Sequence, residues 1–110
     1  MRFYPLEKLI NLHDNYSARF KIDHLHLMLV QRDGVLYLLE ARCPHRDYPL
    51  DAAEITDGMI RCAQHGYQFA LDDGRLLLAT EEPCRGLRTF PIIYEGNEVG
   101  VLLDDGADAP

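Results

Sequence analysis

The sequence has few basic residues and no long apolar run. Eleven lysines and arginines stand against eighteen aspartates and glutamates, which gives a net charge of −7. Nucleic-acid binding requires clustered positive charge, so we expect no nucleic-acid partner. The chain has no apolar stretch of about 18 residues, which predicts that it does not span a membrane. Its first residues lack the apolar run and the cleavage site of an export signal, so we expect a cytoplasmic location.

Cysteine is also scarce, with three residues: Cys43, Cys62 and Cys84. An odd number of cysteines without an export signal argues against a disulfide framework and favours metal or redox chemistry in a reducing compartment. The chain has 110 residues, which is the size of one domain. This length leaves no room for a separate catalytic domain beside a binding domain.

Alternating apolar residues predict an all-β fold. Residues 19–30 have a period of two, which is typical of a strand with one buried face. The pair Asp33-Gly34 separates this run from the next apolar run and predicts a hairpin turn. Residues 6–10, which follow Pro5, are expected to form one helical turn.

The middle of the chain, residues 43–74, is rich in proline, aspartate and glycine and is expected to be rich in loops. A loop-heavy stretch of this length inside a compact domain is usually functional. We therefore expect one domain with an antiparallel β sandwich or partly open barrel as its base, formed by residues 1–42 and 75–103. Residues 43–74 are expected to form an inserted subdomain, and residues 104–110 a disordered tail.

All the strong metal-binding chemistry lies in this middle segment. Cys43-Pro44-His45 is followed, after sixteen residues, by Cys62-Ala63-Gln64-His65. Thiolates and imidazoles together suit zinc or iron. Zinc fingers usually pair cysteine with cysteine and histidine with histidine, whereas each loop here offers one of each. The pattern therefore favours a two-iron cluster in which each loop donates its cysteine to one iron and its histidine to the other.

These residues resemble the Rieske [2Fe–2S] signature, Cys-x-His followed by Cys-x-x-His. The resemblance extends to residues 57–69 and 87–92 and covers about residues 5–103. It implies one [2Fe–2S] cluster as cofactor. It also implies that the cysteines hold the buried iron and the histidines hold an outer iron near the surface. The expected ligands are Cys43, His45, Cys62 and His65.

Residues beside the ligands are expected to shape the cluster's surroundings; they are Pro44, Arg46, Tyr48, Gln64, Gly66, Tyr67 and Phe69. Rieske proteins of cytochrome bc complexes carry a disulfide at two of these positions, and this sequence has Tyr48 and Gln64 there. That branch also places hydroxyl groups of a serine and a tyrosine near the cluster, where this sequence has Tyr67 and Phe69. Fewer hydrogen bonds to the reduced cluster predict a low potential, on the order of −150 mV.

The resemblance implies a one-electron carrier and not an enzyme. Such a protein takes an electron from a reductase, expected to be a flavoprotein, and passes it to a terminal oxygenase by transient docking. A permanent small subunit of a larger oxidoreductase, such as a nitrite reductase, remains an alternative. A zinc-stabilised interaction module is the alternative of another class. The length is expected to exclude a complete Rieske oxygenase, and Cys84 is expected to be a free thiol.

Overall fold

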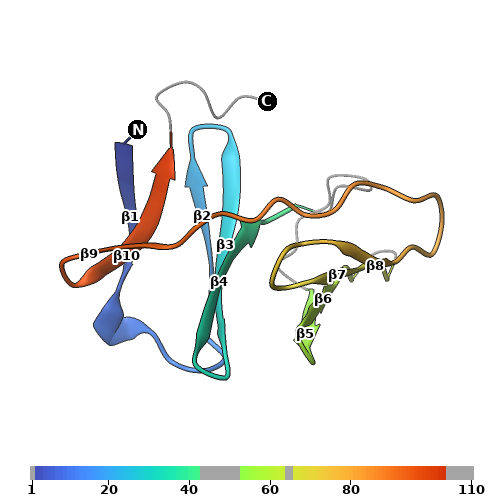
Figure 1. Ribbon diagram of the computed structural model, residues 1–110, viewed down its shortest axis with the longest axis horizontal. Helices are drawn as coiled ribbons and strands as arrows, with labels where there is room; N and C mark the ends of the chain where they lie inside the picture. The colour runs from blue at the N-terminus through green and yellow to red at the C-terminus, as the bar shows by residue number, and fades with distance from the viewer. Residues whose placement is uncertain (1, 43–52, 64–65, 104–110) are drawn as a thin grey trace. The chain divides into compact units, whose positions relative to one another are not determined.

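The computed structural model describes residues 2–42, 53–63 and 66–103, which form antiparallel β-sheets (Figure 1). This confirms the predicted all-β class. The chain divides into two compact units: unit 1 lies within Met1–Leu38 and Phe90–Pro110, and unit 2 is Leu39–Thr89. Among the described residues, no helix has the length and apolar character needed to cross a membrane.

Unit 1 contains two three-stranded sheets. One sheet has the order β1-β10-β9, and the other has the order β2-β3-β4. β4 crosses the boundary between the units along the sequence, because unit 1 ends at Leu38. The strands are β1 (Arg2–Lys8), β2 (Ser17–Ile22), β3 (Leu25–Arg32), β4 (Val35–Glu40), β9 (Ile93–Glu95) and β10 (Glu98–Leu103).

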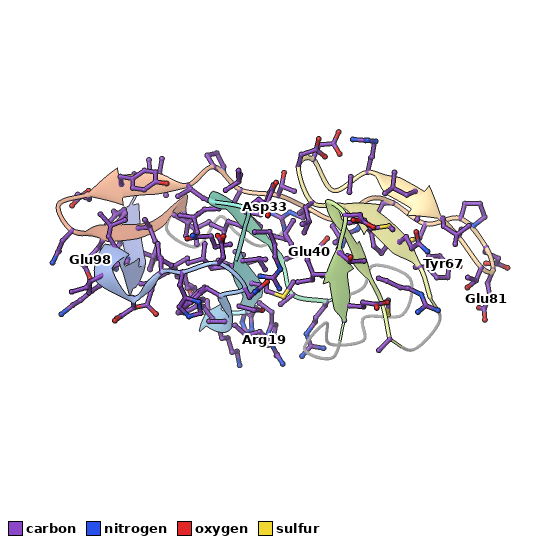
Figure 2. All side chains as sticks on the ribbon, turned by 90° about the horizontal axis from the view of Figure 1, so that it is seen from below. Arg19, Asp33, Glu40, Tyr67, Glu81 and Glu98 are labelled. Carbon is purple, nitrogen blue, oxygen red and sulfur yellow. The ribbon has the colours of Figure 1, made fainter. Side chains whose placement is uncertain are left out.

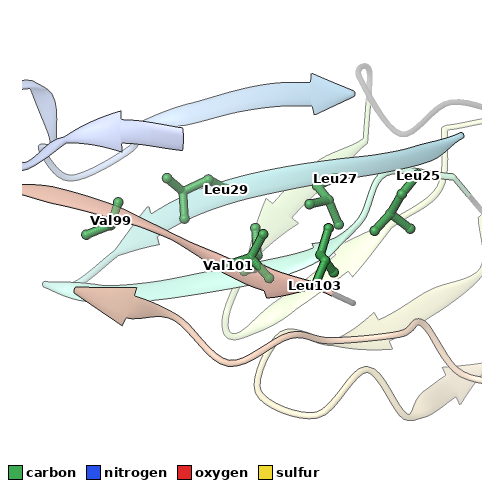
Figure 3. Packing of buried hydrophobic residues seen from close by; sticks show 7 residues of the cluster. Leu25, Leu27, Leu29, Val99, Val101 and Leu103 are labelled. Atoms are coloured by element: carbon green, nitrogen blue, oxygen red, sulfur yellow. The ribbon is translucent and has the colours of Figure 1, made fainter. Parts of the chain in front are cut away.

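The core of unit 1 lies between β3 and β10 (Figure 3). Alternate residues of a strand point to one face, so the period-two pattern gathers apolar side chains on the inner face of each sheet. Two strands thus supply most of the buried cluster, which supports the sandwich expected for the base. The labelled core residues are Leu25, Leu27, Leu29, Val99, Val101 and Leu103.

The predicted turn between β3 and β4 is confirmed. Asp33 has φ 53° and Gly34 has φ 77°. Two successive residues of positive φ form the type I′ turn that matches the twist of a two-residue hairpin. Asp57 and Gly58 have φ values of 51° and 75° and connect two strands of unit 2 in the same way.

The structure corrects two local predictions. Residues 19–30 are not one continuous strand, because a turn at Asp23, whose φ is 55°, separates β2 from β3. The helical turn expected at residues 6–10 is displaced, since β1 continues to Lys8 and a single 3-10 turn, η1, spans Leu9–Asn11. Pairing of Lys8 with Glu98 of β10 keeps the chain extended, and this sheet pairing outweighs the local helical pattern.

A pH-dependent contact joins β1 to the residue before β2. Glu7 accepts hydrogen bonds from Asn11 Nδ2 at 2.9 Å, the Tyr16 hydroxyl at 2.8 Å and the Lys8 N–H at 2.9 Å. These bonds, those from Asn11 and Tyr16 above all, hold the pKa of Glu7 below its ordinary value of 4.5. A lowered pKa stabilises the fold above pH 4.5, and this contribution is lost as the pH falls through the folded-state value.

We therefore expect Glu7→Gln to lower the urea midpoint more near pH 7 than near pH 3, because the stabilisation by the Glu7 carboxylate declines as the pH falls below 4.5. Equilibrium unfolding at the two pH values measures this difference. Glu95→Gln, at an exposed glutamate of β9, is the control. An equal loss of stability at both pH values would show that the Glu7 charge contributes nothing.

Unit 2 contains one four-stranded sheet of order β5-β6-β7-β8. Each strand has three residues, so the segment expected to be rich in loops is organised by very short strands. The sheet buries Ile60 and Phe69, which lie opposite each other in the pairing of β6 with β7. The strands are β5 (Glu54–Thr56), β6 (Met59–Arg61), β7 (Gln68–Ala70) and β8 (Leu76–Leu78).

Two backbone segments of unit 2 cross at Gly74. The Leu87 N–H donates to the Gly74 carbonyl at 2.7 Å, and the Gly74 N–H donates to the Ala70 carbonyl at 2.9 Å. A Cβ atom on Gly74 would lie 2.0 Å from the Leu87 carbonyl oxygen, so this crossing requires glycine. These contacts tie residues 75–89, expected in the base, to the segment before them. Unit 2 runs from Leu39 to Thr89, so residues 75–89 lie in it.

Candidate metal centre

Cys62 lies in the loop that joins β6 to β7. Its N–H donates to the Tyr67 carbonyl at 2.8 Å, and its carbonyl accepts a hydrogen bond from the Gly66 N–H at 2.9 Å. Gly66 has φ 74°, a left-handed conformation that glycine adopts without steric cost. The Cys62 side chain is a free thiol and only 1% exposed. The sequence therefore places this predicted ligand, with its side chain buried, in a loop closed by backbone hydrogen bonds.

The other predicted ligands lie outside the described residues; they are Cys43, His45 and His65. So do four residues expected beside them, namely Pro44, Arg46, Tyr48 and Gln64. The described part of the chain contains no group of three or more His, Cys, Asp or Glu residues that could hold a metal ion. The four-residue ligand set therefore stays a prediction, with Cys62 as its described member.

Tyr67 and Phe69 follow this loop and are both fully buried. The Tyr67 hydroxyl donates to the Glu82 carbonyl at 2.5 Å. Buried phenols usually find such a partner, since an unpaired hydroxyl in an apolar setting is costly. Phe69 lies in β7 and has no polar group to offer. Tyr67 thus links the Cys62 loop to Glu82, which lies 15 residues further along the chain. Figure 2 labels Tyr67 among the side chains.

Residues 79–88, here called the return segment, pass beside the Cys62 loop. A Cβ atom on Gly66 would lie 3.5 Å from Thr80 Cγ2, so these residues are in close proximity. The return segment contains no strand. It connects β8 to Thr89, which forms an isolated β-bridge with Leu39.

Glu40 anchors the far end of the return segment. Its carboxylate accepts hydrogen bonds from both terminal nitrogens of Arg85, at 2.5 and 3.1 Å, and from the Arg88 N–H at 2.7 Å. The Glu40 side chain is 11% exposed, and a carboxylate this deeply buried needs such partners. The local sequence pattern does not reveal this contact, because Arg85 lies 45 residues from Glu40. The feature that indicates it in the sequence is Glu40 itself, a single acidic residue at the end of an apolar strand. A carboxylate in that position needs a cation elsewhere in the fold as its partner.

Cys84 lies in the return segment and is half-buried. It is a free thiol, as predicted. Burial raises its pKa, and the positive charge of Arg85 opposes that rise in part. The thiol is therefore mostly protonated near neutral pH, which makes it a poor nucleophile.

Comparison with known proteins identifies the family. The family model for the Rieske [2Fe-2S] domain matches residues 2–91. The chain belongs to the Rieske family. Residues 2–91 include every predicted ligand and the whole of unit 2, so the match covers the whole candidate centre.

Two kinds of curated Rieske protein are similar to the chain. The terminal oxygenase component of carbazole 1,9a-dioxygenase from a Sphingomonas species is 28% identical over 98% of this chain and 31% of its own length. The ferredoxin component of biphenyl 2,3-dioxygenase from Rhodococcus jostii is 29% identical over 66% of each chain. This Rieske chain thus spans about a third of the first relative and about two thirds of the second.

Solved Rieske structures share the fold. The ferredoxin of carbazole 1,9a-dioxygenase from Nocardioides aromaticivorans superposes with a TM-score of 0.78 at 21% identity, over 92% of this chain and 97% of the ferredoxin. A complex of oxygenase and ferredoxin of carbazole 1,9a-dioxygenase matches with a TM-score of 0.75 at 25% identity. That match covers 90% of this chain and 27% of the matched chain.

The Rieske family implies a [2Fe–2S] cluster. The described residues fit this cofactor, since Cys62 offers a buried, free thiol in a loop closed by two backbone hydrogen bonds. Thiolate sulfur is the ligand that iron–sulfur clusters require. The two backbone hydrogen bonds also fix the backbone of Cys62 in this loop.

Proposed function

We propose that this chain is a one-electron carrier that transfers electrons from a reductase to a terminal oxygenase. Cys43, His45, Cys62 and His65 would hold its [2Fe–2S] cluster. The observation that carries the proposal is the family match over residues 2–91 together with the buried Cys62 thiol. When bound, the cluster supplies reversible one-electron chemistry.

The residues of the chain prepare the site for this role. The closed loop positions Cys62, and the buried Tyr67 and Phe69 side chains give the loop an apolar surrounding. The net charge of −7 suits brief docking on basic partner surfaces. The proposed reductase is a flavoprotein, and the proposed location of the carrier is the cytoplasm.

Metal analysis and EPR spectroscopy test the proposal. We expect two irons and two acid-labile sulfides per chain, and a rhombic Rieske-type signal after reduction with dithionite. Potentiometric titration should fit a single electron, with a midpoint on the order of −150 mV. An EPR-silent protein with one zinc ion would refute the proposal, and a midpoint well above 0 mV would refute the predicted low potential.

A second candidate is the Rieske portion of a terminal oxygenase. The 28% identity over 98% of this chain to an oxygenase component favours it. Stopped-flow mixing separates the two, with the carbazole dioxygenase oxygenase component as a surrogate acceptor. A separate carrier should be reoxidised at a rate that rises with acceptor concentration. Reoxidation independent of the acceptor would favour the second candidate.

A further inference from the structure

We propose that Tyr67 is a positioning residue that holds the return segment against the Cys62 loop and thereby limits the access of water to the cluster. This inference rests on the proposed function, since it concerns the potential of the same cluster. Tyr67 acts through the return segment and contacts it at Glu82.

Tyr67 is fixed at two points. Its backbone carbonyl accepts the Cys62 N–H, and its hydroxyl donates to the Glu82 carbonyl. The side chain between these points is fully buried. One residue therefore links the backbone of a proposed cluster ligand to the middle of the return segment.

The return segment is held from both sides. Near the loop, Glu82 is bound by Tyr67, and Thr80 lies beside Gly66. Further along the chain, Arg85 is bound by Glu40. Because the segment contains no strand, no sheet ladder holds it in place. Loss of the Tyr67 hydroxyl would release the portion nearest the Cys62 loop.

The role of the hydroxyl determines the sign of its effect on the potential. A tyrosine hydroxyl has one hydrogen, and here that hydrogen goes to Glu82, not to a cluster sulfur. Removing a hydrogen bond to sulfur lowers the potential of a cluster, whereas greater exposure to water stabilises the more negative reduced form and raises it. Loss of the hydroxyl would therefore lower the potential if Tyr67 donated to a cluster sulfur, and it would raise the potential if Tyr67 positions the return segment.

Tyr67→Phe is the test, because it removes the hydroxyl and keeps the ring. Tyr94→Phe is the matched control, since Tyr94 lies on β9 and is 60% exposed. Both proteins are compared with the wild type by potentiometric titration of the reconstituted cluster. Hydrogen–deuterium exchange of residues 79–88 is followed by mass spectrometry with and without the cluster.

We expect Tyr67→Phe to make the potential less negative and to speed amide exchange in the return segment several-fold, while Tyr94→Phe changes neither. A lower potential would overturn the inference and make Tyr67 a hydrogen-bond donor to the cluster. An unchanged potential would overturn it as well, whether or not exchange is faster. A wild-type protein without a Rieske signal would refute the proposed function; a failure of Tyr67→Phe alone refutes only this inference.

Discussion

Replacing Cys62 with alanine is expected to abolish cluster binding, with iron and sulfide falling to background and the EPR signal lost. Alanine cannot ligate iron, and three remaining ligands would leave one iron with an open position. The fold itself should survive. Loss of one buried sulfur atom costs about 1 kcal/mol, by comparison with the removal of a buried methyl group. Iron and sulfide analysis of purified protein measures the effect, and circular dichroism verifies the fold.

Cys84→Ala is the control for this experiment. Both cysteines are free thiols, but Cys84 lies in the return segment and is half-buried. We expect the Cys84 variant to retain full iron content and an unchanged spectrum. If Cys62→Ala kept its cluster, the ligand set predicted from the sequence would be wrong. If both variants lost it, the loss would reflect general instability of unit 2.

Gly74→Ala is expected to unfold unit 2. A Cβ atom at this position would lie 2.0 Å from the Leu87 carbonyl oxygen, which is backbone and cannot rotate away. The two segments must separate, and the 2.7 Å hydrogen bond between Leu87 and Gly74 is then lost. We expect a cost of about 4 kcal/mol or more, in the range of the most disruptive single substitutions. Urea unfolding at pH 7 and cluster content both measure it.

Gly58→Ala is the matched control, because Gly58 has nearly the same φ, 75° against 77°, and lies in the same unit. Nothing lies within 4 Å of a Cβ atom there, so this variant bears only the cost of a left-handed alanine, about 1 kcal/mol. The difference in unfolding free energy between the two variants therefore measures the cost of the steric clash at Gly74. Equal losses of stability would show that the segments separate easily at Gly74.

The sequence predicts the strands of unit 1 well, because alternation and turn chemistry are local signals. The missed turn at Asp23 also had a local signal. Apolar residues occupy even positions at Phe20 and Ile22, whereas the leucines that follow occupy odd positions, at 25, 27 and 29. A change of parity moves the apolar side chains to the other face of a strand, so a turn or bulge must intervene. Asp23 supplies it, since aspartate tolerates positive φ.

In the candidate centre too, some features can be predicted from local sequence and others depend on tertiary contacts. The ligand pattern can be recognised because each pair lies within a few residues of sequence. The hydrogen-bond partners of Tyr67 and Glu40 cannot be recognised in this way. Glu82 lies 15 residues from Tyr67, and Arg85 lies 45 residues from Glu40. Only the folded chain brings such groups together. Sheet pairing at Lys8 is likewise a tertiary effect, which explains why the local helical pattern at residues 6–10 was misleading.

The bridge between Leu39 and Thr89 has a consequence for how such proteins diversify. The chain enters and leaves unit 2 at neighbouring positions, with the Glu40 N–H bonded to the Arg88 carbonyl. On the unit 1 side, the Phe90 N–H is bonded to the Leu38 carbonyl. A unit whose two ends are adjacent can be replaced by the equivalent unit of a related protein without changing the path of the rest of the chain, because only two neighbouring junctions are needed. Residues 39–89 are therefore a natural unit for chimeras between Rieske proteins.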